Sequence, residues 1–146
     1  MKCAIIYSSV TGNTKELAEQ IYTIFLSRFV DVHLFSIHEF KLPHLSKYDA
    51  VVIGTYSWGN GEIPEEMQKL YNTFSDFLKS NVVTAVFGTG DSFYPHYCGA
   101  VDKFTEILYT NTNLAATLKV ELLLQEQDLM RCQMFVESVI KRSFKK

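Results

Sequence analysis

Short, almost uninterrupted apolar runs alternate with helical patterns along the whole sequence. We predict strands over Lys2–Tyr7, Val30–Ser36, Asp49–Tyr56, Val82–Gly88 and Leu118–Leu124, and helices over Asn13–Arg28, Pro64–Lys79, Ala100–Tyr109 and Asp128–Lys141. Strands that are apolar on both faces indicate a parallel sheet covered by helices on both sides. Because crossovers between parallel strands are right-handed, the pattern predicts an α/β fold with a doubly wound five-stranded parallel sheet, in one domain spanning residues 1–146.

Charge and composition argue against several classes of protein. The net charge is −2, and four of the fourteen cationic residues lie in the last six positions, so the rest of the chain is acidic and we expect no nucleic-acid partner. No apolar run is long enough to cross a bilayer, and the start of the chain reads as a strand, so we expect a cytoplasmic protein with no membrane association. Three cysteines without a CxxC motif, and four histidines without a metal-ligand spacing, predict no disulfide scaffold and no metal site.

Ligands of doubly wound sheets bind beyond the carboxyl ends of the strands, where the strand order reverses. The loops that follow the first, third and fourth predicted strands are therefore the places to look for a site. They span Ser8–Thr14, Tyr56–Ile63 and Thr89–Gly99.

The first of these loops has the composition of a phosphate cradle. It combines four hydroxyl side chains with a glycine and an asparagine directly before a helix, where backbone N–H groups and the positive end of the helix favour an anion. It carries no Lys or Arg and matches neither the triphosphate-binding loop nor the GxGxxG dinucleotide loop. A neutral cradle suits a single phosphate monoester; the alternative is that the hydroxyls only cap the helix. The candidate residues are Ser8, Ser9, Val10, Thr11, Gly12, Asn13 and Thr14.

The second loop carries the only tryptophan of the chain. Trp58 is followed by Gly-Asn-Gly, which permits unusual backbone angles. An aromatic side chain at the end of a strand is well placed to cover a flat ligand, although it could equally pack over the helix that follows. The candidate residues here are Thr55, Tyr56, Ser57, Trp58, Gly59, Asn60 and Gly61.

The third loop holds four rings within five positions, Phe93 to Tyr97. Exposed aromatic side chains in a loop call for an explanation: either a second flat face for the same ligand or a docking patch for a partner. Asp91 and the loop N–H groups could accept and donate hydrogen bonds at the edge of a heteroaromatic ring. The candidate residues are Thr89, Gly90, Asp91, Tyr94, Tyr97 and Cys98.

Together these loops resemble those of the flavodoxin family. Ser9–Thr14 looks like its (Ser/Thr)-x-Thr-Gly-x-Thr phosphate loop, Trp58-Gly59 like its inner ring-stacking residue and the glycine beside flavin N5, and Gly90–Asp102 like its third loop. In that resemblance Tyr94 stacks on the outer flavin face, and Asp91 with the Cys98 backbone addresses the pyrimidine edge. The last predicted strand runs into Gln125 with no long insertion, as in the short-chain type.

The resemblance implies a flavodoxin-like sheet in the strand order 2-1-3-4-5 and one non-covalently bound FMN. It also implies a low-potential one-electron carrier, cycling between semiquinone and hydroquinone, rather than an enzyme with catalytic residues. The implied partners are an NAD(P)H-dependent flavodoxin/ferredoxin reductase and acceptor redox enzymes, bound transiently by a monomer. Asn60, where the family often has an acidic residue, Lys15 and the weak net acidity depart from the family's pattern.

Three other functions are compatible with parts of this pattern. A flavin-binding activator of a ribonucleotide reductase shares the fold and the FMN, but the long aromatic third loop favours flavodoxin. A flavin-dependent quinone or porphyrinogen oxidoreductase would turn over NADPH and quinone without an added reductase. A receiver-type signalling domain needs acidic residues at the ends of the first and third strands, where this chain has Tyr7-Ser8 and Thr55-Tyr56.

Overall fold

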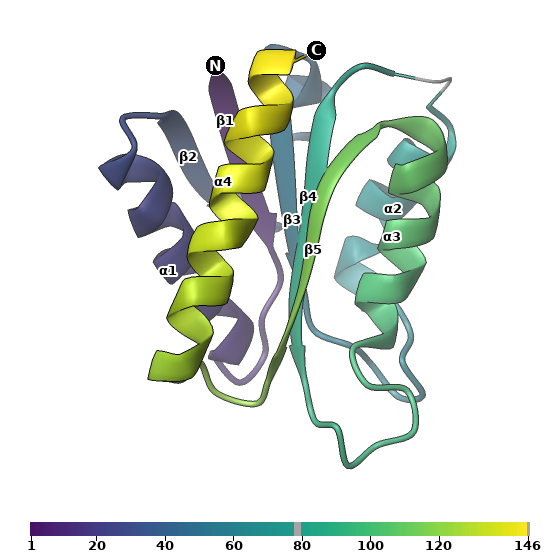
Figure 1. Cartoon of the computed structure of the whole chain (residues 1–146). Helices are drawn as coiled ribbons and strands as arrows, with labels where there is room; N and C mark the ends of the chain where they lie inside the picture. Colours follow the sequence, from purple (N-terminus) through teal and green to yellow (C-terminus); the bar gives the residue numbers. More distant parts are fainter. Residues whose placement is uncertain (78–79, 146) are drawn as a thin grey trace.

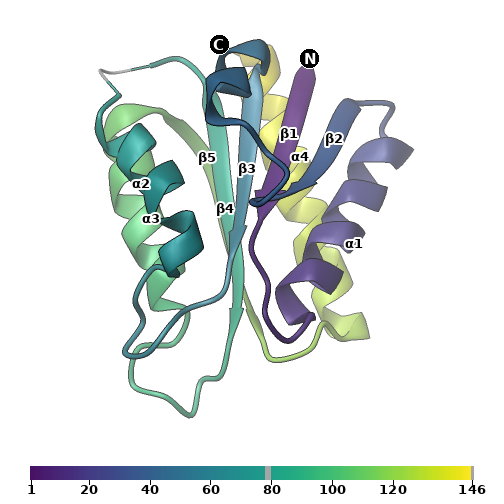
Figure 2. The same cartoon turned by 180° about the vertical axis from the view of Figure 1, so that it is seen from behind.

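The computed structural model describes residues 1–77 and 80–145 as one five-stranded parallel sheet with helices on both faces (Figures 1 and 2). The strand order is β2-β1-β3-β4-β5, as the resemblance implied. The strands are β1 (Lys2–Tyr7), β2 (Asp31–Ser36), β3 (Ala50–Thr55), β4 (Val83–Gly90) and β5 (Asn113–Glu121). The helices are α1 (Asn13–Ser27), α2 (Gln68–Ser75), α3 (Gly99–Asn111) and α4 (Leu129–Lys145), with short 3-10 turns η1 (Leu42–Lys47), η2 (Glu65–Met67) and η3 (Glu126–Asp128).

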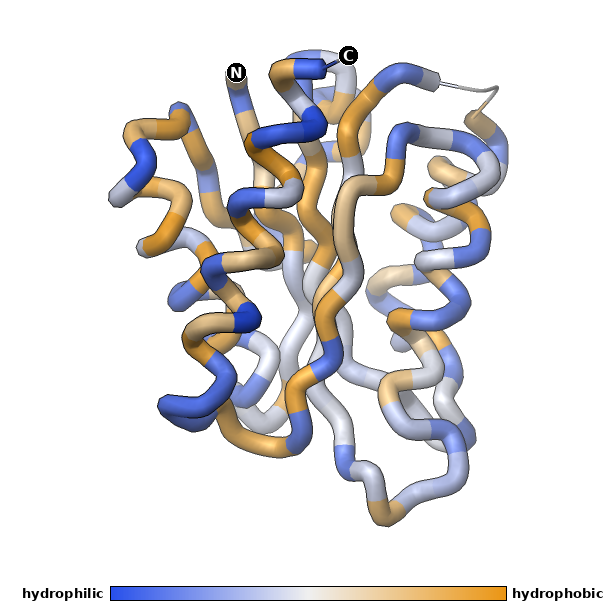
Figure 3. The backbone as a smooth tube through the Cα atoms, in the orientation of Figure 1, coloured by the Kyte–Doolittle hydropathy of each residue, from blue (hydrophilic) through white to orange (hydrophobic). Residues whose placement is uncertain are grey.

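The alternation of side chains along the strands divides the interior into two apolar cores, one on each face of the sheet. In β1, Cys3 and Ile5 pack in the core under α1 and α4, whereas Ala4 and Ile6 pack in the core under α2 and α3. Because successive side chains of a strand point to opposite faces, a strand buried on both sides has to be apolar at every position. β3 is buried along its whole length and is apolar up to its last residue, Thr55, and apolar segments run down the centre of the molecule in Figure 3.

The fifth strand differs from its prediction. It begins at Asn113 rather than Leu118 and ends at Glu121, so the apolar run Leu122–Leu124 lies outside the sheet. Its first half is rich in alanine and only half-buried, which gives a weak strand signal. Leu122 adopts a positive φ of 53°, which ends the strand and turns the chain toward α4.

Other element bounds differ as well. Pro64 precedes η2, and the regular helix α2 starts only at Gln68 and ends at Ser75. The side-chain amide of Asn111 donates to the carbonyls of Phe74 and Ser75, which satisfies orphan acceptors at that helix end. Residues 78 and 79 of the predicted helix lie outside the described part of the chain. β4 continues through Gly90, and α4 reaches Lys145, so the basic residues Lys141, Arg142 and Lys145 belong to a helix.

The parallel arrangement places the three predicted loops together at the carboxyl edge of the sheet. Both termini lie at the opposite edge, where β1 begins and α4 ends (Figure 1). Within residues 1–77 and 80–145, no helix is long and apolar enough to span a membrane.

Candidate functional site

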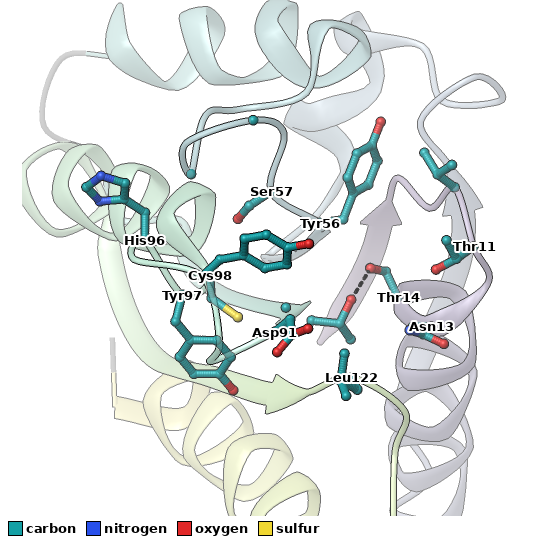
Figure 4. Close-up of a pocket in the computed structure, with 16 residues that line it drawn as sticks. Thr11, Asn13, Thr14, Tyr56, Ser57, Asp91, His96, Tyr97, Cys98 and Leu122 are labelled. Carbon is teal, nitrogen blue, oxygen red and sulfur yellow. Dashed lines mark hydrogen bonds between the residues drawn. The ribbon is translucent and has the colours of Figure 1, made fainter.

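The three loops meet around one cavity of about 290 Å³ (Figure 4). The first loop contributes mainly polar groups, and the second and third loops contribute rings and glycines as well, so the cavity is polar toward α1 and aromatic toward α3. Most of the residues predicted for the site line it: Val10, Thr11, Asn13, Thr14, Tyr56, Ser57, Gly59, Gly61, Thr89, Gly90, Asp91, Tyr94, Tyr97 and Cys98.

Some predicted residues lie outside this cavity. Ser8, Ser9 and Gly12 line a separate cavity of about 200 Å³. Thr55 is fully buried at the end of β3, and its hydroxyl donates to the Tyr56 carbonyl 2.7 Å away. Trp58 and Asn60 of the second loop are exposed and do not line this cavity.

Two residues that line the cavity were missed by the sequence analysis. His96 belongs to the ring cluster of the third loop, but a lone histidine without a partner motif carries no recognisable signal. Leu122 was assigned to a strand. Its backbone N–H donates to the Gly90 carbonyl at 2.7 Å, which holds this fourth segment against the end of β4 and its side chain at the cavity wall.

The first loop offers backbone donors that the protein itself does not use. Within the described residues, no acceptor takes the N–H groups of Thr11, Asn13 or Thr14, and the Thr11 hydroxyl has no partner either. Gly12, the N-cap of α1, has a φ of 96°, and no atom lies within 4 Å of where a Cβ would stand. A glycine tolerates this left-handed conformation, which points the flanking N–H groups outward. The loop therefore presents several donors without a cation, which fits a single anionic group.

Ser9 does act as a cap, as the alternative interpretation of this loop supposed. Its hydroxyl oxygen accepts hydrogen bonds from the N–H groups of Gly12 and Lys15, each at 3.2 Å. These two bonds close the loop on itself and fix its shape. Capping by Ser9 and donation by the rest of the loop are thus compatible.

A buried pair of hydroxyls joins the first loop to the end of β4. The Oγ1 atoms of Thr14 and Thr89 are 2.7 Å apart, and the two residues are 1% and 5% exposed. The dashed line at Thr14 in Figure 4 marks this hydrogen bond. Thr14 lies in the first turn of α1, and Thr89 is the last but one residue of β4. This contact ties the polar side of the cavity to the strand that carries the third loop.

One carboxylate links the first and second loops through hydrogen bonds. Glu66, in η2, accepts hydrogen bonds from the Ser8 hydroxyl at 2.5 Å and from the Tyr56 hydroxyl at 2.7 Å. Burial alone would raise the pKa of Glu66, but the two hydroxyl donors and the nearby His38 lower it below its ordinary value. Burial and the Glu66 carboxylate raise the pKa of Tyr56 to about 12. The Ser8 hydroxyl therefore uses its proton in the hydrogen bond to Glu66.

The second loop is a tight hairpin. The Trp58 N–H donates to the Glu62 carbonyl at 2.8 Å, and the Glu62 N–H donates back to the Trp58 carbonyl at 2.7 Å. Gly59 and Gly61 both have positive φ, 52° and 85°. The hydrogen bonds close the base of the hairpin and leave the Gly59–Asn60 peptide at its tip.

The second and third loops are in direct backbone contact. A Cβ on Gly61 would stand 2.6 Å from the His96 Cβ and 3.1 Å from the Gly99 Cα, closer than side chains tolerate. The Ser57 hydroxyl accepts a hydrogen bond from the Ala100 N–H at 3.0 Å. Only glycine allows the two loops to come this close, so their relative position depends on it.

The aromatic side chains of the third loop are largely exposed. Tyr94 is 63% exposed, and its ring contacts that of Phe93 edge to face, with centroids 6.2 Å apart. Asp91 accepts a hydrogen bond from the Phe93 N–H at 2.9 Å, which shapes the start of the loop, while its side chain lines the cavity. Tyr97 is backed by Lys119, whose Nζ lies 5.8 Å from the ring centroid.

These groups fit a flat ligand that bears one phosphate. The first loop supplies unused N–H and hydroxyl donors, and the other two supply rings, a carboxylate and backbone groups around the remaining space. In the described part of the chain, no group of three or more His, Cys, Asp or Glu side chains could hold a metal ion.

Comparison with known proteins identifies the family. A model of the flavodoxin family matches residues 5–131. The probable flavodoxin 1 of Bacillus subtilis is 32% identical over 143 residues, which covers 95% of this chain and 90% of that protein. Oxidised flavodoxin 1 from Bacillus cereus has 30% identity and a TM-score of 0.87, covering 97% of this chain and 98% of that one.

A solved short-chain flavodoxin, associated with a non-canonical PDU bacterial microcompartment, has a TM-score of 0.91 at 25% identity. The alignment covers 98% of this chain and 99% of that one, so no long insertion separates the two folds. With the strand order, the three loops and these matches in agreement, the chain belongs to the flavodoxin family and is of the short-chain type.

Proposed function

We propose that this protein carries electrons one at a time on a single, non-covalently bound FMN, between its one-electron and two-electron reduced forms. Flavodoxins are electron-transfer proteins that bind FMN, and the observation that supports this role most directly is the cavity shared by all three loops. The isoalloxazine ring supplies the redox chemistry, and the protein supplies position and electrostatics.

The phosphate end of the site, residues 8–14, is proposed to hold the FMN phosphate. The free N–H groups of Thr11, Asn13 and Thr14 and the Thr11 hydroxyl are suitable donors. Because hydrogen bonds to a charged acceptor are stronger than neutral ones, a cation-free loop can still hold a phosphate monoester. Ser9 and Gly12 act here by shaping the loop.

The ring end, residues 55–61 and 90–98, is proposed to hold the isoalloxazine. We assign Tyr94 to the outer ring face and Trp58 to the inner face. Asp91 and the backbone of Cys98 serve the pyrimidine edge. In the structure Trp58 and Tyr94 are each 63% exposed, so both side chains have room to turn onto a ring.

The tip of the second loop is suited to stabilise the one-electron form. We propose that, with FMN bound, the carbonyl of the Gly59–Asn60 peptide would accept a hydrogen bond from N5 of the ring. The hydrogen bonds between Trp58 and Glu62 confine any movement of that peptide to the tip, and a Cβ at Gly59 would meet no atom within 4 Å. The obstacle to substitution at Gly59 is therefore conformational rather than steric.

Negative charge near the ring should keep the potential of the second electron low. Asp91 lines the cavity, and Glu62 in the second loop and Glu65 in the following η2 have exposed side chains. Adding charge to a ring that is already next to carboxylates is unfavourable in a partly apolar site.

We infer that redox partners bind over the loops with a basic face. Glu62 in the second loop and Glu65 in η2 are exposed, and the exposed Phe93 of the third loop offers an apolar contact. Asp102 contributes less, because Lys119 pairs with it at 2.8 Å. The proposed partners are an NAD(P)H-dependent reductase and acceptor redox enzymes, which bind transiently to a monomeric, single-domain, cytoplasmic carrier. Association should slow as ionic strength rises.

Stepwise reduction of the FMN-loaded protein, followed by absorbance and potential, tests this function. The expected result is a large population of one-electron reduced FMN at half reduction and a well-separated, lower second potential. A hydrogen bond worth about 0.5–1.5 kcal/mol corresponds to some tens of millivolts, so Gly59→Val should lower the first potential by roughly that amount while FMN stays bound. Direct passage to the two-electron form in the wild type would contradict the proposal and favour an oxidoreductase.

A further inference from the structure

Two hydrogen-bonded threonine pairs in the described residues differ in how they use their hydroxyl protons. Thr84 and Thr89 lie on the same strand, β4, and each is within 2.7 Å of another threonine hydroxyl: Thr112 for the first and Thr14 for the second. A pair of hydroxyls has two protons, of which one makes the mutual hydrogen bond. The acceptor of the second proton therefore distinguishes the two pairs.

In the remote pair both protons are used. The Thr112 hydroxyl donates to the Leu108 carbonyl at 2.6 Å, so Thr84 has to be the donor to Thr112. This is the common behaviour of helical hydroxyls in this chain: those of Thr23, Thr73 and Thr105 likewise donate to the carbonyl four residues before them.

In the pair at the site one proton is left over. Within residues 1–77 and 80–145, neither Thr14 nor Thr89 has a hydrogen-bond acceptor for its hydroxyl other than the partner hydroxyl. Both side chains are more than nine-tenths buried and both line the 290 Å³ cavity. A buried hydroxyl proton without an acceptor is costly, so the cavity is where its acceptor belongs.

The strongest acceptor in the proposed complex is the phosphate, and Thr14 is the member of the pair whose own N–H is also free at the phosphate end. We propose that Thr89 is a positioning residue for phosphate recognition: it donates its proton to Thr14, and Thr14 then donates its own proton to the FMN phosphate. This inference rests on the proposed function, since it takes a phosphate monoester as the ligand. Thr89 itself does not touch the phosphate.

The experiment compares the affinities of FMN and riboflavin, which differ by the phosphate, for the apoprotein by fluorescence titration. Thr89→Val keeps the shape of the side chain and should weaken FMN by roughly threefold to tenfold, the equivalent of one neutral hydrogen bond, without changing riboflavin. Thr89→Ser should restore FMN binding. Thr84→Val removes a hydroxyl from the remote pair and serves as the matched control: it should lower stability and leave the FMN-to-riboflavin ratio unchanged.

A double-mutant cycle tests whether Thr89 acts through Thr14. If it does, Thr89→Val has no further effect on FMN affinity once Thr14 is valine. Additive losses of FMN affinity in the double variant would overturn the inference. An equal loss of riboflavin and FMN affinity in Thr89→Val would also overturn it, because the spare proton would then be donated to the ring or the ribityl chain. A wild-type protein that binds both ligands equally would instead contradict the proposed phosphate site itself.

Discussion

At the phosphate end Thr14 is buried and the Ser9 hydroxyl closes the loop through two hydrogen bonds, whereas at the ring end the aromatic side chains are exposed. Thr14 is 1% exposed and hydrogen-bonded, but Trp58 and Tyr94 are each 63% exposed. The phosphate end is therefore shaped before a ligand arrives, and the ring end has side chains still to be ordered. We expect the phosphate to supply selectivity at low entropic cost and the ring end to supply affinity that depends on ordering.

The largest effect should come from the contact between the second and third loops. In Gly61→Ala the new Cβ meets His96 and the Gly99 backbone, and the residue has to keep a φ of 85°. Overpacking and left-handed strain together should cost about 2–4 kcal/mol of the free energy of unfolding. Chemical denaturation of the apoprotein measures this cost.

Gly12→Ala is the matched variant at the phosphate end. Gly12 also has a positive φ, 96°, but nothing lies within 4 Å of its Cβ position. Gly12→Ala should therefore lose only about 1–2 kcal/mol of the free energy of unfolding, the cost of an alanine in the left-handed conformation. If Gly61→Ala and Gly12→Ala lose the same free energy of unfolding, the second and third loops separate easily, which would contradict the close contact seen in the structure.

Thr11→Val probes the phosphate end alone. The Thr11 hydroxyl has no partner within the described residues, so its loss removes a donor to the phosphate and leaves the fold intact. FMN affinity should fall by about 1.5–3 kcal/mol, the range for a hydrogen bond to a charged group, and riboflavin affinity should stay constant. Titration of the apoprotein with FMN and with riboflavin tests this prediction. An equal loss of affinity for both ligands would assign Thr11 to the ring end instead.

Tyr94→Ala probes the ring end in the same way. Loss of one stacked ring should weaken binding by about 1–3 kcal/mol, with base-on-aromatic stacking as the nearest analogue. Here riboflavin and FMN should lose affinity equally, since both carry the ring. Trp58 fluorescence should be quenched when FMN binds to the wild type. Unchanged affinity and unchanged fluorescence would assign these side chains to a partner surface.

The smallest expected effect concerns the carboxylate behind both loops. The pKa of Glu66 is lowered in the folded protein from 4.5, so its hydrogen bonds with Ser8 and Tyr56 stabilise the fold above pH 4.5 and are lost as the pH falls through the folded-state pKa. In Glu66→Gln the free energy of unfolding should depend less on pH below pH 4.5 than it does in the wild type. Above pH 4.5 the two proteins should show the same dependence on pH. Denaturation midpoints across this range measure it; parallel profiles throughout would contradict the role of Glu66.

The order and type of the main strands and helices could be predicted because strand burial on both faces leaves a plain apolar signal. The ends of the elements were harder, since they depend on contacts distant in sequence. The fifth strand was misplaced because Leu122–Leu124 is apolar for a different reason: Leu122 leaves the sheet and lines the cavity. A local pattern cannot distinguish these two causes of hydrophobicity.

The site shows the same division. Residues with a motif, such as Thr11 and Asp91, line the cavity, whereas Ser8 lies outside it and Leu122, which the sequence did not predict, lines it. The Ser8 hydroxyl is used by Glu66, which is 58 residues away in the sequence. The pairing of Thr14 with Thr89, 75 residues apart, was equally hidden. Long-range hydrogen bonds decide which hydroxyls remain available to a ligand.

Both chain ends lie at the edge of the sheet opposite the loops, and this placement matters for attaching the protein to something else. The eight residues of β4 alone extend over about 26 Å between the two edges. A tag, a fused domain or a solid support joined at Met1 or beyond Lys145 would therefore leave the cavity facing outward and accessible to a diffusing partner. An electrode reached through the same attachment would be separated from the cofactor by the length of the sheet, so direct electron exchange with it should be slow.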